Sequence, residues 1–202
     1  SRQVTAIEIN GTFYRLQTPE TFAKWRDETP DDFVFSIKAP RHIVSRRDLA
    51  EGAESIQRFV DSGLAELGAK LGPILWQLPP TKTFAATEVG TFLRILPSRA
   101  GDSRLRHAVE VRHESFRCPE YLAIARGLGV TTVFAHDDRY PQIADLTGDF
   151  VYARLRQSVA SEPTGYAPNA LSAWAARASA WASGHEWSDL PRIERPSNPR
   201  TR

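Results

Sequence analysis

The sequence has a single cysteine, Cys118, and no methionine among its 202 residues. One cysteine excludes an intramolecular disulfide, and no apolar run approaches the roughly 20 residues that a membrane-spanning helix needs. No signal peptide is visible, so a reducing cytoplasm is the predicted location. Because the chain starts without Met and enters strand-like sequence almost at once, we expect a fragment or a processed form.

An excess of charge of one sign is also missing. The 26 Lys and Arg residues are nearly balanced by 24 Asp and Glu, which leaves a net charge of +2. This balance is not typical of a protein that binds nucleic acid, and it indicates no partner by itself. The hydrophobic share of 41% is enough for one domain with a substantial core.

What the sequence does contain is a regular alternation of strand and helix patterns. Ile7 and Ile9 alternate with Glu8 and Asn10 as on a strand, and Thr18 followed by Pro19 is typical of a helix start. The same criteria predict strands over 4–10, 33–39, 74–78, 105–111, 130–135 and 150–155, and helices over 18–28, 53–67, 89–96, 121–128 and 171–181. Such alternation predicts a parallel sheet covered by helices.

The stretch Arg106-His-Ala-Val-Glu-Val-Arg-His113 contains the strongest sign of a site. Glu110 and Arg112 are two residues apart, so both side chains leave the same face of a strand. A buried carboxylate and guanidinium are unfavourable unless they pair with each other or meet a ligand. The pair is therefore either a structural ion pair or part of a binding site.

Polar residues recur where the other predicted strands end. In parallel α/β folds the ligand site lies at the carboxyl ends of the strands, so we expect these residues to converge there. The set comprises Glu8, Asn10, Lys38, Arg41, Gln77, Glu110, Arg112, His136, Asp137 and Arg154.

Four blocks of the sequence resemble the YecE-like family, named domain of unknown function 72. They are Glu8-Ile-Asn-Gly-Thr-Phe-Tyr14, Phe35-Ser-Ile-Lys-Ala-Pro-Arg41, Leu71-Gly-Pro-Ile-Leu-Trp-Gln-Leu-Pro79 and Ala108-Val-Glu-Val-Arg-His113. The resemblance implies a TIM-type (β/α) barrel with eight strands, of which this chain would lack the first βα unit. It implies no reaction.

Two departures from the family pattern affect the interpretation. The run Phe134-Ala-His-Asp-Asp-Arg139 replaces the usual segment after the fifth strand, so either His136 or Asp137 could take its acidic position. The family's last strand is not recognisable after Gly184. We therefore expect a YecE-like domain over 1–184 and an irregular or disordered tail, rich in Arg, Pro and Ser, over 185–202.

Three classes of function follow from these residues. The first is an enzyme for a small anionic ligand bearing phosphate or carboxylate, with Glu8 and Glu110 as proton-transfer groups. The ligand-binding residues would be Asn10, Lys38, Arg41, Gln77, Arg112, Asp137 and Arg154, although strand-end cations can also be solvated rim charges. No cofactor is indicated.

The second class is a metal-dependent hydrolase or nuclease, with ligands drawn from Glu8, Glu110, His113, His136 and Asp137. No paired His-x-His motif supports this class, and His113 has the parity that turns away from Glu110. The third class is a noncatalytic barrel that binds a ligand or nucleic acid through the basic cluster over 41–47.

Overall fold

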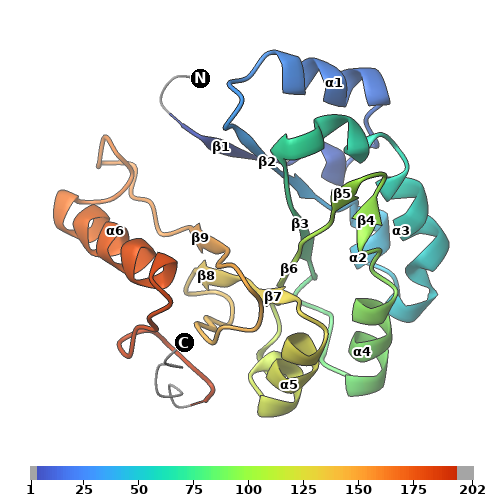
Figure 1. The fold of residues 1–202 in the computed structure, drawn as a ribbon. Helices are drawn as coiled ribbons and strands as arrows, with labels where there is room; N and C mark the ends of the chain where they lie inside the picture. Colours follow the sequence, from blue (N-terminus) through green and yellow to red (C-terminus); the bar gives the residue numbers. More distant parts are fainter. Residues whose placement is uncertain (1–3, 195–202) are drawn as a thin grey trace.

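The computed structural model describes residues 4–194. Five parallel strands form its central sheet, in the spatial order β1 (Ala6–Ile9), β2 (Val34–Lys38), β3 (Leu71–Gln77), β6 (His107–Glu110) and β7 (Thr131–Thr132) (Figure 1). The spatial order follows the chain order, as expected when each strand is connected to its neighbour by a crossover outside the sheet.

A second parallel pair, β8 (Phe134–His136) and β9 (Ala153–Leu155), continues this arrangement. Only Val133 separates β7 from β8, and its backbone N–H still donates to the Val109 carbonyl oxygen of β6 at 2.9 Å. The predicted strand over 130–135 is thus one run of chain that pairs first with β6 and then with β9.

The sheet does not close into a barrel. Within residues 4–194 no strand pairing joins β9 to β1, so the fold is a mixed α/β fold with a mostly parallel sheet. The closed TIM-type barrel that the family resemblance implies is therefore not confirmed. A separate antiparallel hairpin of β4 (Arg99–Ala100) and β5 (Ser103–Arg104) was not predicted.

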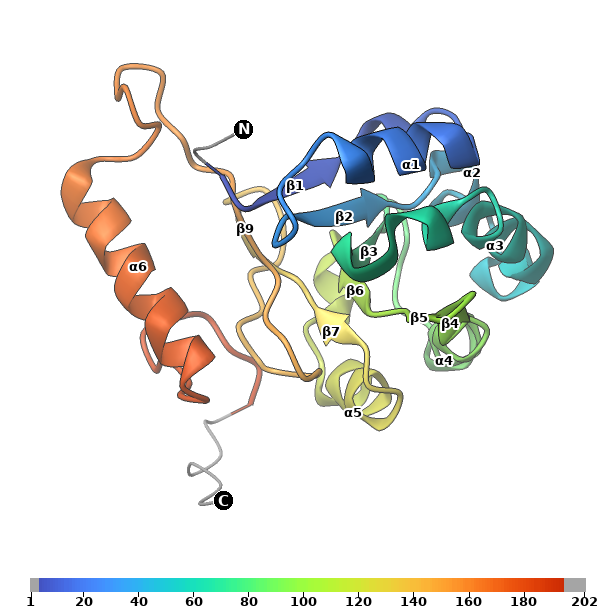
Figure 2. The same ribbon diagram turned by 45° about the horizontal axis from the view of Figure 1, so that its top comes forward.

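The helices lie mainly on one side of the sheet. α1 (Pro19–Asp27), α3 (Ala53–Val60), α4 (Ala86–Arg94) and α5 (Pro119–Gly127) follow its outer side, whereas α6 (Pro168–Ala182) lies apart, beside β8 and β9 (Figures 1 and 2). α1 begins as predicted, because the Thr18 side chain accepts a hydrogen bond from the Thr21 backbone N–H. Shorter helical segments are α2 (Arg41–Val44), η1 (Gly11–Phe13), η2 (Leu49–Gly52), η3 (Leu64–Lys70) and η4 (Glu114–Phe116).

The main core lies between the sheet and the outer helices. Trp76 of β3 is fully buried there, with its ring edge-to-face against Phe59 of α3 and Phe92 of α4. The Trp76 indole N–H donates to Nδ1 of His107 at 3.1 Å, so the polar atom of this large side chain also has a partner. Trp76 is thus a core residue, as its position in an apolar strand suggests.

The opposite, concave face of the sheet has a thin apolar layer. Leu75, Ala108 and Val133 form a small buried cluster there, against which Phe150 and Tyr152 pack. Side chains on a strand alternate between faces, so Gln77 and Glu110, two residues beyond Leu75 and Ala108, lie on the same face. The apolar layer therefore forms the floor beneath the polar strand ends.

The predicted helix over 53–67 is the largest local correction. α3 ends at Val60, because Gly63 has φ +124, a conformation outside the helical range that side-chain-bearing residues avoid. The rest of that apolar stripe continues as η3, so Leu64 and Leu67 are buried as predicted but in a different helix. The proline-marked loop after β2 also forms one helical turn, α2.

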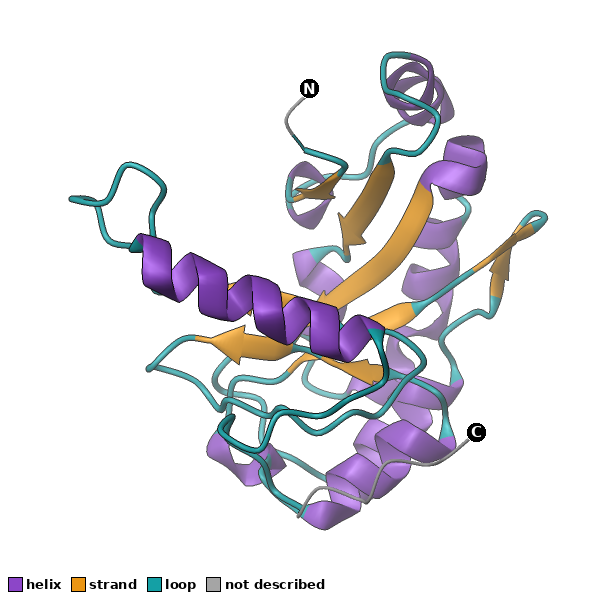
Figure 3. Ribbon diagram, turned by 60° about the vertical axis from the view of Figure 1, so that its left-hand side comes forward, coloured by secondary structure: helices purple, strands orange, loops and turns teal. Residues whose placement is uncertain are grey.

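The predicted tail contains no helix or strand over residues 185–194, but this part packs on the domain. The backbone N–H groups of Ile193 and Glu194 donate to the Asp145 carboxylate at 2.8 and 3.1 Å, and Leu190 is buried beside Phe134 and Trp174 of α6. Figure 3 shows α6 lying across the end of the sheet that contains β8 and β9. Residues 195–202 lie outside the described residues.

Candidate functional site

The polar strand ends converge on the concave face of the sheet. Register pairs Glu8 of β1 with Ser36 of β2, Gln77 of β3 with Glu110 of β6, and Ala135 of β8 with Arg154 of β9. Paired positions in neighbouring strands have side chains on the same face. Residues separated by up to 146 positions in the chain therefore meet in one cluster.

Glu110 is at the centre of this cluster and is fully buried. Its carboxylate accepts hydrogen bonds from Gln77 Nε2 at 2.9 Å, from Arg112 Nε at 2.7 Å and from Arg154 Nη1. Burial by itself raises the pKa of Glu110, but the nearby Arg154 and Arg112 guanidinium groups outweigh it and hold this pKa below its usual value. Glu110 is consequently ionised at neutral pH.

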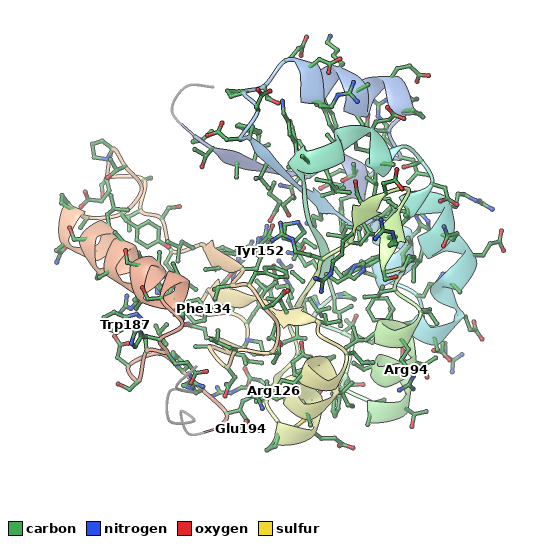
Figure 4. The ribbon with its side chains drawn as sticks, in the orientation of Figure 1. Arg94, Arg126, Phe134, Tyr152, Trp187 and Glu194 are labelled. Atoms are coloured by element: carbon green, nitrogen blue, oxygen red, sulfur yellow. The ribbon has the colours of Figure 1, made fainter. Side chains whose placement is uncertain are left out.

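Arg154 connects the two ends of the sheet. Besides Glu110, it donates through Nη2 to Glu8 Oε1 at 2.8 Å, which links β9 to β1 where backbone pairing is missing. The other Glu8 oxygen accepts from the Tyr152 hydroxyl at 2.8 Å, and that hydroxyl also lies 2.8 Å from Ser36 Oγ. Tyr152 is labelled in Figure 4, where it lies between β9 and the first strands.

Arg156 joins a third carboxylate to the cluster. Its Nη1 is 3.8 Å from Glu110 Oε1, and its Nε is 3.3 Å from Asp137 Oδ2. Asp137 also accepts two hydrogen bonds from the Arg139 guanidinium, at 3.0 and 2.9 Å. These bonds from Arg139 lower the pKa of the Asp137 carboxyl to about 2.

Lys38 lies at the end of β2 and is only 8% exposed. No hydrogen bond or ion pair joins its amine to any residue in the range 4–194, and its nearest aromatic contact is Phe13, whose ring centroid is 4.1 Å from Nζ. Burial lowers the pKa of Lys38, and the positive charge of Arg154 lowers it further. Most of the Lys38 side chain is buried, but its amine is not among the buried polar atoms that lack a partner, so the amine keeps contact with solvent.

The concave face is open on one side. A groove of about 460 Å³ between β1 and β9 is lined by Glu8, Ser36, Tyr152 and Arg154 of the cluster, together with residues near the amino ends of the strands such as Val34 and Arg106. Arg112 at the rim stacks over Tyr140, with 4.5 Å between its guanidinium carbon and the ring centroid. The side of the cluster formed by Glu8, Tyr152 and Arg154 thus borders a space large enough for a small molecule, whereas Lys38, Glu110 and Arg112 do not line it.

Seven of the nine predicted site residues meet in this cluster: Glu8, Lys38, Gln77, Glu110, Arg112, Asp137 and Arg154. Asn10 and Arg41 do not, because each is exposed where the chain has already turned away from its strand. Sequence reasoning missed Ser36 and Tyr152 as site residues. Tyr152 precedes Arg154 by two positions, so strand alternation was the signal that could have identified it.

The ligands proposed for a metal-dependent enzyme do not form a metal-binding group among the described residues. Within residues 4–194 there is no group of three His, Cys, Asp or Glu side chains that could hold a metal ion. His113 is hydrogen-bonded to Ser115, and His136 lies 3.2 Å from the Tyr166 hydroxyl. The same described range contains no helix of the length and apolarity required to span a membrane.

Comparison with known proteins gives the family. The family described as "Protein of unknown function DUF72" matches residues 1–190, which is nearly the whole chain. The chain belongs to the DUF72 family. This match confirms the resemblance of the four sequence blocks to the YecE-like family.

Curated relatives of this DUF72 protein include UPF0759 protein YecE of Escherichia coli K12, 32% identical over 130 residues. That match covers 63% of this chain and 46% of YecE. UPF0759 protein YunF of Bacillus subtilis is 27% identical over 120 residues, which cover 57% of this chain and 42% of YunF. The matched regions thus span less than half the length of these relatives.

Solved structures of the family share the fold. A DUF72 family protein of Enterococcus faecalis superimposes with a TM-score of 0.67 at 15% identity, covering 92% of this chain and 80% of that one. One from Thermotoga maritima gives a TM-score of 0.64 at 21% identity, covering 89% and 74%. At these identities the likeness concerns the fold and not the chemistry of the site.

Proposed function

We propose that this DUF72 protein binds a small anionic metabolite, bearing phosphate or carboxylate, at the carboxyl ends of its strands, and that it is an enzyme acting on that ligand. The observation that carries the proposal is the charge of the cluster. Five cations lie around only three carboxylates: Lys38, Arg112, Arg139, Arg154 and Arg156 against Glu8, Glu110 and Asp137.

Three of these five cations lie where water has limited access. Lys38 has no anionic partner within residues 4–194, and the Arg112 and Arg154 side chains are only 14% and 16% exposed. Positive groups in a partly desolvated site attract an anion more strongly than exposed groups do, because the effective dielectric constant is lower. A phosphate or carboxylate group would balance the excess.

The two carboxylates at the strand ends have different surroundings. Glu110 has its oxygens occupied by Gln77 and two arginines, which suits a group that holds the cations in position. Glu8 is less buried, with a side chain 19% exposed, and it shares a hydrogen bond with Tyr152. We therefore assign proton transfer to Glu8 and positioning of Arg112 and Arg154 to Glu110.

The architecture supports the same place for the site. Parallel strands in chain order, helices outside and a thin apolar layer inside are the arrangement of a TIM-type (β/α) barrel wall. In such barrels the carboxyl ends of the strands carry the chemistry. We infer a barrel-type site on this basis, although the described strands do not close.

The test is a thermal-shift titration of the intact protein with phosphate, sulfate and acetate at constant ionic strength. A ligand that binds only the folded state stabilises it by about 2.7 kcal/mol at 100 times its Kd. We expect a saturable rise in Tm that is retained in Lys24→Gln, a control at an exposed lysine, and weakened at least fivefold in Lys38→Gln. No saturable rise with any anion, or equal rises in both variants, would overturn the proposal.

A further inference from the structure

The protein has four lysines, and Lys38 differs from the other three. Lys24 is exposed and pairs with Glu28 at 3.8 Å. Lys82 donates to the Glu88 carboxylate at 2.8 Å and to a backbone carbonyl. Each of these two amines has an acceptor that stabilises its charged form.

Lys70 is the informative comparison, because it is as buried as Lys38, with both 8% exposed. Its amine donates to the carbonyl oxygens of Arg26 and Thr29 at 2.6 and 2.7 Å, which is how a structural lysine is satisfied. Lys38 has no such acceptor within residues 4–194. The Lys38 amine instead lies over the Phe13 ring, and no hydrogen bond within this range gives it a structural role.

The surroundings of Lys38 hold its backbone firmly and leave its amine available. The Thr12 hydroxyl donates to the Lys38 carbonyl oxygen at 2.7 Å, which fixes the end of β2 under η1, and the Phe13 ring centroid lies 4.1 Å from the amine. The charged groups around the amine are Arg154, Glu8, Glu110 and Arg112, and both carboxylates already accept from Arg154. Burial and Arg154 together lower the pKa of Lys38, which increases the share of uncharged, nucleophilic amine at neutral pH.

We propose that Lys38 forms an imine with the carbonyl carbon of an anionic aldehyde or ketone, such as a 2-oxo acid or a phosphorylated ketose or aldose fragment. This inference rests on the proposed anion site and specifies its substrate class. The carboxylate or phosphate would lie against the excess arginine charge, and the carbonyl carbon would lie within reach of Nζ.

The bonds change as follows. The lone pair of the Lys38 amine attacks the carbonyl carbon, a C–N bond forms, and the C=O π electrons move to oxygen to give a carbinolamine. The C–O bond then breaks, and oxygen leaves as water with the two hydrogens that the amine loses. Glu8 and the Tyr152 hydroxyl, hydrogen-bonded at 2.8 Å, are the proton-exchanging pair on this face that can pass those hydrogens. No oxidant or reductant is consumed.

The experiment traps the imine by reduction. Intact protein is incubated with pyruvate, glyoxylate or dihydroxyacetone phosphate and sodium cyanoborohydride at pH 7, and the modified lysines are identified by peptide mass spectrometry. A lowered pKa leaves more of the amine uncharged at neutral pH, so we expect several times more adduct on Lys38 than on Lys24, and little on the equally buried Lys70.

Two further arms separate this inference from anion binding itself. Lys38→Arg keeps the positive charge but cannot form an imine, so it should lose the adduct while its Tm still rises with phosphate. Excess phosphate should slow adduct formation on Lys38 and leave Lys24 unaffected. Adduct on Lys38 no greater than on Lys24 with all three carbonyl compounds overturns the imine. If phosphate still raises the Tm in that case, the anion site stands alone, and if it does not, both proposals fail.

Discussion

Glu110→Gln is the perturbation that most directly tests the energetics of the charge cluster. The substitution keeps the side chain's shape but removes a negative charge that is 1% exposed and is bound to Arg112 and Arg154. Removing one partner of a buried ion pair costs about 3–5 kcal/mol, because the remaining charges stay buried without compensation. For a chain of this length, about 2–4 °C of Tm is lost per kcal/mol, so we expect a fall of roughly 6–20 °C.

The free energy of unfolding, measured by urea denaturation at several pH values, gives a sharper result. The folded-state pKa of Glu110 lies below its ordinary value of 4.5. At acidic pH, Glu110 therefore binds fewer protons in the folded state than in the unfolded state. Its contribution is therefore complete above about pH 4.5 and is lost as the pH falls through the folded-state pKa. The difference between wild type and Glu110→Gln should shrink below that pH.

Glu114→Gln is the matched control. Glu114 is paired with Arg117 at 3.9 Å, but its side chain is 71% exposed, and such surface pairs contribute at most about 1 kcal/mol. If Glu110→Gln costs no more than Glu114→Gln, or if its cost does not change between pH 7 and pH 3, the buried cluster does not stabilise the fold as reasoned.

Three further predictions concern other parts of the structure. In Gly72→Ala the new Cβ would lie 2.6 Å from a Val34 methyl carbon and 2.8 Å from a backbone oxygen, so we expect a loss of about 1–3 kcal/mol by urea denaturation. The control Gly127→Ala, with open space around it, should be neutral or stabilising. Carbon-detected NMR titration should find a pKa near 2 for Asp137, and an ordinary value would mean that its Arg139 contact does not form in solution. Tyr152→Phe should cost about 1–2 kcal/mol, since the Glu8 carboxylate loses a buried donor, and the exposed Tyr14→Phe should cost nothing measurable.

The local sequence was sufficient for most of the secondary structure. The Thr18 cap and Pro19 predicted the start of α1 correctly, and the strands predicted around β2, β3 and β6 lie where the apolar runs placed them. Where prediction failed, a single backbone conformation decided the outcome. Gly63 ends α3 at φ +124, and an apolar stripe does not distinguish one long helix from two short ones with the same buried face.

The candidate site, too, was predicted only in part from the sequence. The two-residue spacing of Glu110 and Arg112 was readable from the sequence, and their direct contact at 2.7 Å follows from that spacing. The register of β3 against β6 was not readable, although it sets Gln77 beside Glu110. Asn10 and Arg41 were included because they follow strands, but the chain direction after each strand depends on how the next helix packs.

By itself, the sequence determined the alternating strands and helices, the family and the residues that end each strand, because these depend on local periodicity and on short motifs. Only the tertiary structure decided which charges neutralise one another. The curvature of the sheet brings Arg154 to Glu8, 146 positions away, and to Glu110, and it leaves Lys38 buried without an acceptor within residues 4–194. Ion pairs depend on distances of a few ångströms between side chains from remote strands, and such distances are set by the packing of the whole sheet rather than by any local pattern.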